Sequence, residues 1–182
     1  MRERILETAE RLARSAGYGE VTYREIAKDI GIKGASVHYH FPTKAELGVA
    51  LVEAYAARFR DRLAAIDQSD VELAIKAYIA LYEEALVLGE SICLCAVFGA
   101  EAIGLPAEIN AQTSDFFELN LQWLKELFEK HLGDDGTDLA TLVVSSLEGA
   151  MIIASVKSDR GVFARITNEM RRLIRARKMR AS

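Results

Sequence analysis

The chain has 182 residues, of which 51% are hydrophobic and 27% are charged, and its formal net charge is −4. With only two prolines, this composition predicts a globular and mostly helical protein. Two cysteines exclude a disulfide scaffold. Charged residues interrupt every apolar stretch, and the start of the chain lacks the apolar core of a secretory signal, so we expect a cytoplasmic protein with no membrane partner.

The charge is unevenly distributed along the chain. Residues 1–47 hold eight Lys and Arg against seven Asp and Glu, residues 48–132 hold six against fourteen, and residues 133–182 hold nine against six. The acidic excess therefore lies in the middle of the chain. We interpret the basic end, RRLIRARKMRAS, as the solvated last turns of a helix, where cations also suit the helix dipole. A second nucleic-acid contact is the alternative.

No stretch of the sequence has the alternating pattern of a β-strand, so we predict an all-α fold. Apolar residues recur at helical spacing throughout. The nine predicted helices cover about residues 2–16, 22–31, 34–40, 43–67, 70–88, 91–104, 106–132, 137–157 and 161 onward. Gly89 and Ser91 mark one break, and residues 133–137 form a loop. At 1.5 Å per residue, the fourth helix would be about 37 Å long. It is long enough to link an N-terminal head to a C-terminal body.

The second and third helices are joined by a tight turn. Thr22 has the position of a helix N-cap, and Glu25 completes a capping-box pattern. Gly31 ends this helix, and Pro42 ends the next one because its ring removes a backbone donor. Two short helices joined by a short turn that contains Gly predict a helix-turn-helix.

The exposed side of the second helix of this pair is rich in hydrogen-bond donors. They are Lys33, Ser36, His38, Tyr39, His40 and Lys44. No carboxylate occurs between Asp29 and Glu46, so the surface is locally electropositive. Such a surface suits phosphates and base edges of double-stranded DNA. His38 and His40 are two residues apart and point to different helix faces, so we predict no metal site, and no cofactor is expected.

The order of these residues resembles a known family. Gly31-Ile32, then Ser36-Val37-His38-Tyr39-His40-Phe41, then Thr43-Lys44-Ala45-Glu46-Leu47 resembles the DNA-binding segment of the tetracycline-repressor (TetR) family. The resemblance covers residues 5–51. It implies a DNA-binding domain at residues 1–47, with the effector-binding and dimerisation domain at residues 48–182.

The resemblance also implies roles for single residues. Arg24 and Ser36 match positions that reach bases or nearby phosphates, while Lys33 and Gly34 occupy the turn and the start of the reading helix. The positions that commonly hold the phosphate backbone are His38, Tyr39, His40 and Lys44. Gly34 and Ala35 offer few hydrogen bonds, so base readout falls to Lys33, Ser36 and the shape of the DNA. Val37 and Phe41 are expected in the core.

The predicted helix over residues 137–157 is apolar on most of its circumference. A helix of this kind is buried on all sides. We therefore predict that it and the last helix form a homodimer interface, because a monomer should not expose so large an apolar patch. The alternative is an ordinary internal helix. A dimer would read a roughly palindromic operator.

The resemblance implies an effector cavity in the body of the protein. Our candidates for an apolar pocket are Tyr78, Tyr82, Cys93, Phe98, Phe116, Trp123 and Met151. The predicted function is a repressor that a small hydrophobic effector releases from its operator. Two alternatives stand beside it: a switch through oxidation or electrophiles at Cys93 or Cys95, and a helical protein-interaction module without DNA binding. No catalytic motif is present, so we predict no enzyme.

Overall fold

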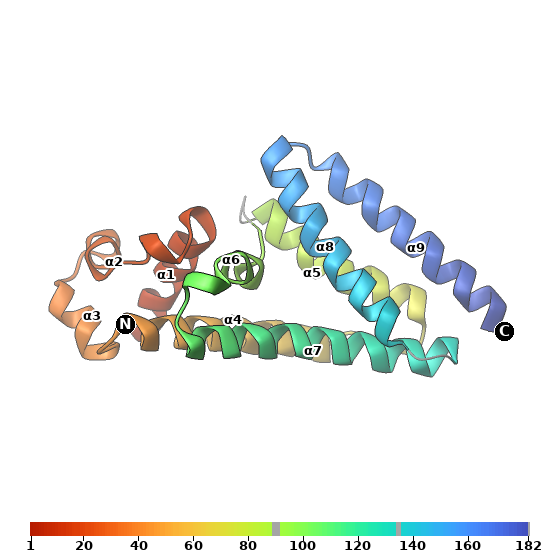
Figure 1. Ribbon diagram of the computed structural model, residues 1–182, viewed down its shortest axis with the longest axis horizontal. Coiled ribbons are helices and arrows are strands. Elements are labelled where there is room, and N and C mark those ends of the chain that lie inside the picture. The colour runs from red at the N-terminus through yellow and green to blue at the C-terminus, as the bar shows by residue number, and fades with distance from the viewer. Residues whose placement is uncertain (89–91, 134–135, 182) are drawn as a thin grey trace. The chain divides into compact units, whose positions relative to one another are not determined.

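A computed structural model describes residues 1–88, 92–133 and 136–181 of the chain. Within these ranges the structure contains nine α-helices, two 3-10 helices and no strand (Figure 1). The helices are α1 (Arg2–Ala16), η1 (Tyr18–Glu20), α2 (Tyr23–Ile30), α3 (Gly34–His40), α4 (Lys44–Ala64), α5 (Val71–Leu88), α6 (Leu94–Ala100), η2 (Ala102–Gly104), α7 (Ala107–Leu132), α8 (Thr137–Lys157) and α9 (Gly161–Ala181). The predicted all-α fold is confirmed.

The predicted bounds of the helices agree closely with those observed. The bounds of α1, α3 and α8 are those that the sequence predicts. By contrast, α4 ends at Ala64 instead of Asp67, because the Asp67 carboxylate binds the backbone N–H and the hydroxyl of Ser69 and stabilises a turn there. The predicted short helix over residues 91–104 is two pieces, α6 and η2. The break predicted at Gly89 and Ser91 lies outside the described residues, as do residues 134–135 of the loop predicted over 133–137.

The chain divides into two compact units. Unit 1 comprises residues 1–59 and 94–116, and unit 2 comprises residues 60–93 and 117–182. Both α4 and α7 contribute residues to each unit. The units describe packing only, and the division of function at residue 47 stays a prediction.

Unit 1 contains the helix-turn-helix and the helices that support it. Its α1 packs against α2, η1 and α6, and α2 packs against α3. Ile5 of α1, Ile26 of α2 and Leu47 of α4 are all fully buried. The Tyr18 hydroxyl donates a hydrogen bond to the backbone oxygen of Lys44 at 2.8 Å. This bond ties the end of the α1 region to the start of α4.

Unit 2 is built around α5, α8 and α9. The three helices pack against one another, and α8 and α9 lie side by side (Figure 1). The sequence led us to expect no segment fit to span a membrane, yet α8 is long and apolar enough to do so, with a mean hydropathy of 1.8. Half of that window is buried inside the fold, which is typical of a core helix.

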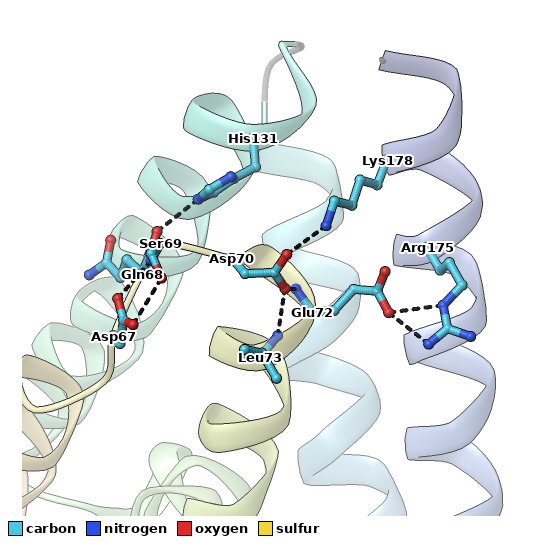
Figure 2. Close-up of polar contacts among 9 residues, drawn as sticks. All are labelled: Asp67, Gln68, Ser69, Asp70, Glu72, Leu73, His131, Arg175 and Lys178. Carbon is cyan, nitrogen blue, oxygen red and sulfur yellow. Dashed lines mark hydrogen bonds and ion pairs between the residues drawn. The ribbon is translucent and has the colours of Figure 1, made fainter.

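The turn before α5 joins three elements of unit 2 through polar contacts (Figure 2). Asp70 accepts the N–H groups of Glu72 and Leu73 at 2.8 and 3.0 Å, so it caps α5. Lys178 of α9 donates to the Asp70 carboxylate at 2.6 Å, and this bond is the main cause that lowers the pKa of Asp70. Arg175 binds Glu72 at 2.7 Å. Two cations of the basic tail therefore pair with carboxylates of their own chain.

The close approach of α7 and the start of α8 makes Gly136 a sensitive position. A Cβ there would lie 2.7 Å from the backbone oxygen of Lys125 and 2.9 Å from the Cβ of Phe128. Since the nearest atom is backbone, α7 itself must shift. We expect Gly136→Ala to lower the free energy of unfolding by about 1–3 kcal/mol, as overpacking does. Thermal unfolding measures it, with Gly104→Ala as the control because that site has open space. Equal melting temperatures for both variants would contradict the prediction.

Candidate nucleic-acid interface

The turn between α2 and α3 is held by local backbone chemistry. Thr22 is the N-cap of α2, and its side chain accepts the Glu25 N–H at 3.2 Å, as the capping pattern predicts. Gly31 ends α2 with a φ of 72°, in the left-handed region that glycine adopts without strain. The Ile32 N–H then bonds back to the Ala27 oxygen at 2.9 Å. These contacts set the angle at which α3 leaves the turn.

Two apolar residues hold α3 against the rest of unit 1. Val37 is fully buried and Phe41 is 3% exposed, so the expected core roles of both are confirmed. The Tyr23 hydroxyl of α2 donates to the Phe41 oxygen at 2.6 Å. The opposite face of α3 is thereby turned to solvent.

Most of the predicted DNA-binding side chains lie on exposed surface. Arg24, Lys33, His38 and Tyr39 are exposed, and the exposed fraction of Tyr39 is 84%. Gly34, Ser36 and His40 are half-buried. The hydrogen-bond donors thus lie on α3 or on the residues beside it, as recognition of a DNA groove by a helix requires.

The side chain of Lys44 contacts Tyr18 and Gly19 of its own chain. Its ammonium lies 4.4 Å from the centre of the Tyr18 ring and donates to the Gly19 oxygen at 3.2 Å. Burial is the main cause that lowers the pKa of Lys44. An ammonium has three N–H donors, so the bond to Gly19 does not exhaust it.

The nearest carboxylates are already engaged. Asp29 at the end of α2 pairs with Arg11 at 2.7 Å and accepts the Thr8 hydroxyl at 3.3 Å. Glu25 pairs with Arg24 at 3.2 Å. An anion that approaches α3 therefore meets donors whose neighbouring carboxylates are partly neutralised.

The seven predicted pocket residues fall into separate clusters. Tyr78, Tyr82, Cys93, Trp123 and Met151 belong to unit 2, where Tyr78 stacks on Trp123 with ring centres 5.4 Å apart. Phe98 and Phe116 belong to unit 1. There Phe98 packs against the edge of Tyr18, and Phe116 contacts Phe59. The aromatic group of unit 2 is thus the part of the set that the structure brings together.

Sequence reasoning missed Glu148. It lies on α8, is 8% exposed, and is the only charged residue between Leu139 and Val156. Within the described residues neither of its carboxyl oxygens accepts a hydrogen bond from an N–H or O–H group, and the Cys93 thiol is the hydrogen-bonding group that acts on it. Burial is the main cause that raises the pKa of Glu148 well above its usual range, and Cys93 is the second. An acid inside an otherwise apolar helical run was the available signal.

The raised pKa of Glu148 predicts how stability depends on pH. The proton is held more tightly in the folded state, so stability is complete below the unfolded pKa, near 4.3, and is lost as pH rises toward the folded pKa. Cys93 is the titratable group that raises the pKa of Glu148, and Glu148 in turn raises the pKa of Tyr78 and of Tyr82. Glu148→Gln should therefore gain stability relative to the wild type as the pH rises from 5 to 8.

Thermal or urea unfolding at both pH values measures this gain. Glu118→Gln is the matched control, because Glu118 is exposed on α7 and the substitution changes the net charge equally. The free energies of unfolding of Glu148→Gln and the wild type should differ more as the pH rises. If that difference stays constant, Glu148 is not a buried carboxyl that retains its proton.

Comparison with known proteins adds to this geometry. Residues 5–51 match the family model of bacterial regulatory proteins, tetR family. A nucleoid occlusion factor SlmA from Aliivibrio fischeri is 27% identical over 173 residues, which are 87% of this chain and 85% of that protein.

Solved structures resemble the chain over nearly its whole length. A TetR transcriptional regulator from Legionella pneumophila matches with a TM-score of 0.90 and 29% identity, over 95% of this chain and 96% of that one. A TetR-family regulator from Agrobacterium tumefaciens matches with a TM-score of 0.89 and 26% identity, over 94% and 95% of the two chains.

Proposed function

The chain carries the DNA-binding domain of the TetR family at residues 5–51 and has the fold of TetR-family transcriptional regulators, and from this premise we propose that it is a ligand-responsive repressor. In this proposal it binds a roughly palindromic operator as a homodimer, and a small-molecule effector releases it. It acts in the cytoplasm and is not an enzyme.

The observation that carries the proposal is the exposed face of α3. Its donors stand on a helix anchored by Val37 and Phe41, and no carboxylate occurs in the sequence from residue 30 to residue 45. We assign His38, Tyr39, His40 and Lys44 to the phosphate backbone. Arg24, Lys33, Gly34 and Ser36 lie at or near the bases. An acidic protein binds DNA through such a locally electropositive element.

The homodimer would form through α8 and α9. Large apolar side chains remain exposed on these two helices, namely Leu142, Ile152, Ile153, Val156, Ile166, Leu173 and Met179. Exposed apolar area on this scale is typical of a protein interface. Two copies related by a two-fold axis would place two reading helices on half-sites about one DNA turn, 34–36 Å, or a multiple apart.

The effector would act through α4 and α7. Both helices contribute residues to unit 1 and to unit 2, so each is a continuous piece of chain from the body to the DNA-binding head. A ligand that rotates α4 in the body would change the separation of the two reading helices and lower operator affinity. Operator affinity that no effector or redox condition changes would oppose this part of the proposal.

Selection of bound fragments from genomic DNA, followed by affinity measurements at increasing salt, tests the proposed function. For six to ten phosphate contacts, the affinity for the selected operator should fall by about 10³–10⁵-fold between 50 and 200 mM salt. A helical interaction module without DNA binding would select no sequence. It would show weak affinity with little dependence on salt.

The cysteine switch remains the second form of the proposal. Reactive cysteines need exposure and a lowered pKa, whereas Cys93 is 2% exposed and Cys95 is fully buried. These burials favour release by a bound effector. If a Cys93→Ser, Cys95→Ser double variant leaves the operator under oxidants or electrophiles just as the wild type does, the cysteines are not the sensor.

A further inference from the structure

Glu148 is the one acidic side chain among the buried residues that the structure describes. A buried carboxyl normally has hydrogen-bond donors or a cation beside it, because removal from water is unfavourable otherwise. Neither oxygen of Glu148 accepts a hydrogen bond from an N–H or O–H group in the described part of unit 2, and the Cys93 thiol is the one hydrogen-bonding group that acts on its pKa. No Lys or Arg is among the groups that set its pKa.

The polar groups nearest to Glu148 are directed elsewhere. The Tyr78 hydroxyl donates to the Asn120 side-chain oxygen at 2.7 Å, and the Tyr82 hydroxyl donates to the same oxygen at 3.3 Å. The two hydroxyls also lie 3.2 Å apart. Each tyrosine hydroxyl has one hydrogen to donate. The bonds to Asn120 and between the two tyrosines therefore engage both hydrogens. The thiol of Cys93 is a weak donor and cannot replace an N–H group.

A second polar atom beside the same tyrosine is also without a partner. The indole N–H of Trp123 is buried and donates to no described residue. The Trp123 ring stacks on Tyr78 at 5.4 Å with an angle of 12° between the planes. Tyr78 lies within electrostatic range of Glu148 as well. The Glu148 carboxyl of α8 and the Trp123 N–H of α7 are thus both near Tyr78 of α5.

We propose that Glu148, Trp123, Tyr78 and Tyr82 form the recognition site for an aromatic organic cation, an amine or protonated nitrogen attached to a ring. Glu148 retains its proton in the free protein and releases it to solvent when the ligand binds; the nitrogen of the ligand then donates to the carboxylate, and its positive charge compensates that group. The ring lies against the aromatic faces of the site, where a cation is also attracted. A hydrogen-bond acceptor on the ligand receives the Trp123 N–H. This inference rests on the proposed function, because it names the chemical class of the effector.

The chemistry discriminates against the other ligand classes. An anion would find no cation at Glu148 and would be repelled by its ionised form, and a neutral hydrocarbon would leave both polar groups unsatisfied. The acidic excess of residues 48–132 adds to the preference, since it raises the local concentration of cations. The inferred effector therefore differs from the small hydrophobic one that the sequence predicts, because it carries a cationic nitrogen.

Because Trp123 is the only tryptophan of the chain, its fluorescence reports on this site directly. The probes are three compounds of similar size: 2-phenylethylamine, 2-phenylethanol and phenylacetate, titrated into the full-length protein without DNA. We expect the amine to bind at least about tenfold more tightly than the alcohol, as charged hydrogen bonds imply. Phenylacetate should bind more weakly than either. Glu148→Gln should abolish the preference for the amine, and Glu118→Gln on the exposed face of α7 should retain it.

Several results overturn the site. They are equal affinity for amine and alcohol, tighter binding of phenylacetate, an amine preference that survives Glu148→Gln, and no fluorescence response to any of the three probes. The comparison of probes on the wild-type protein needs no variant, so the test stands even if Glu148→Gln misfolds. Operator binding is measured separately by fluorescence anisotropy. Amine binding without operator binding refutes the proposed regulator alone, whereas operator binding without an amine preference refutes only the cation site.

Discussion

A protein with Ile153→Asp and Val156→Asp is expected to be monomeric and to lose about 10²–10⁴-fold in operator affinity. Ile153 is 48% exposed and Val156 is 82% exposed, so neither substitution removes a core contact within the chain. In the proposed dimer both would become buried, and the new carboxylates would face their copies across the interface without partners. A monomer binds one operator half-site alone. The gain in affinity that comes from linking two DNA-binding heads is then lost.

Sedimentation or light scattering measures the oligomeric state, and anisotropy measures affinity for the selected operator. Leu73→Asp with Ile103→Asp is the matched control. It adds the same charge at apolar positions that are 65% and 107% exposed and lie outside α8 and α9. If both double variants behave alike, the α8–α9 face is not the interface. A variant that stays dimeric leads to the same conclusion.

Replacing Lys33 with Gln should weaken operator binding by at least about tenfold, and the form of the loss identifies what Lys33 contacts. If the ammonium binds a phosphate, affinity falls for all sequences and the salt slope decreases by about one for each contact removed. If it reads a base, specificity relaxes at one operator position by about 1–3 kcal/mol and the slope changes less. Lys33 is exposed, so the fold should be unaffected.

Arg24→Gln is measured in the same way, by its salt slope and its base specificity. The comparison separates the role of Arg24 from that of Lys33. Lys76→Gln on α5 is the control, since it removes an equal charge from an exposed site in unit 2. The prediction is wrong if Lys33→Gln and Lys76→Gln bind the operator equally well. Tyr39→Ala extends the series to a side chain that is 84% exposed and contacts the His40 ring edge-on.

The helix-turn-helix was predictable from sequence because its signals are local. Thr22 caps a helix whose N–H groups lie within the next three residues, and Gly31 ends it because the left-handed conformation disfavours other side chains. Val37 lies on the seven-residue α3 and Phe41 is the C-cap four positions later, a spacing that follows from the sequence and puts both in the core. Each of these features depends on neighbours a few positions away.

The surroundings of Glu148 depend on long-range packing. The groups that interact electrostatically with it come from α5 and from Cys93 before α6, more than fifty residues away in sequence. No periodicity says which residues of separate helices meet. For the same reason the aromatic set divided into two groups, with Phe116 against Phe59 and Trp123 against Tyr78.

The sequence by itself determined the all-α fold, the bounds of α1, α3 and α8, and the family of the DNA-binding segment, because caps, glycines and apolar spacing act over a few residues. The tertiary structure alone decided which polar groups are left unsatisfied in unit 2. It also decided that Lys178 and Arg175 of the basic tail pair with Asp70 and Glu72. The physical reason is that desolvation and pairing depend on which distant side chains share a position in space.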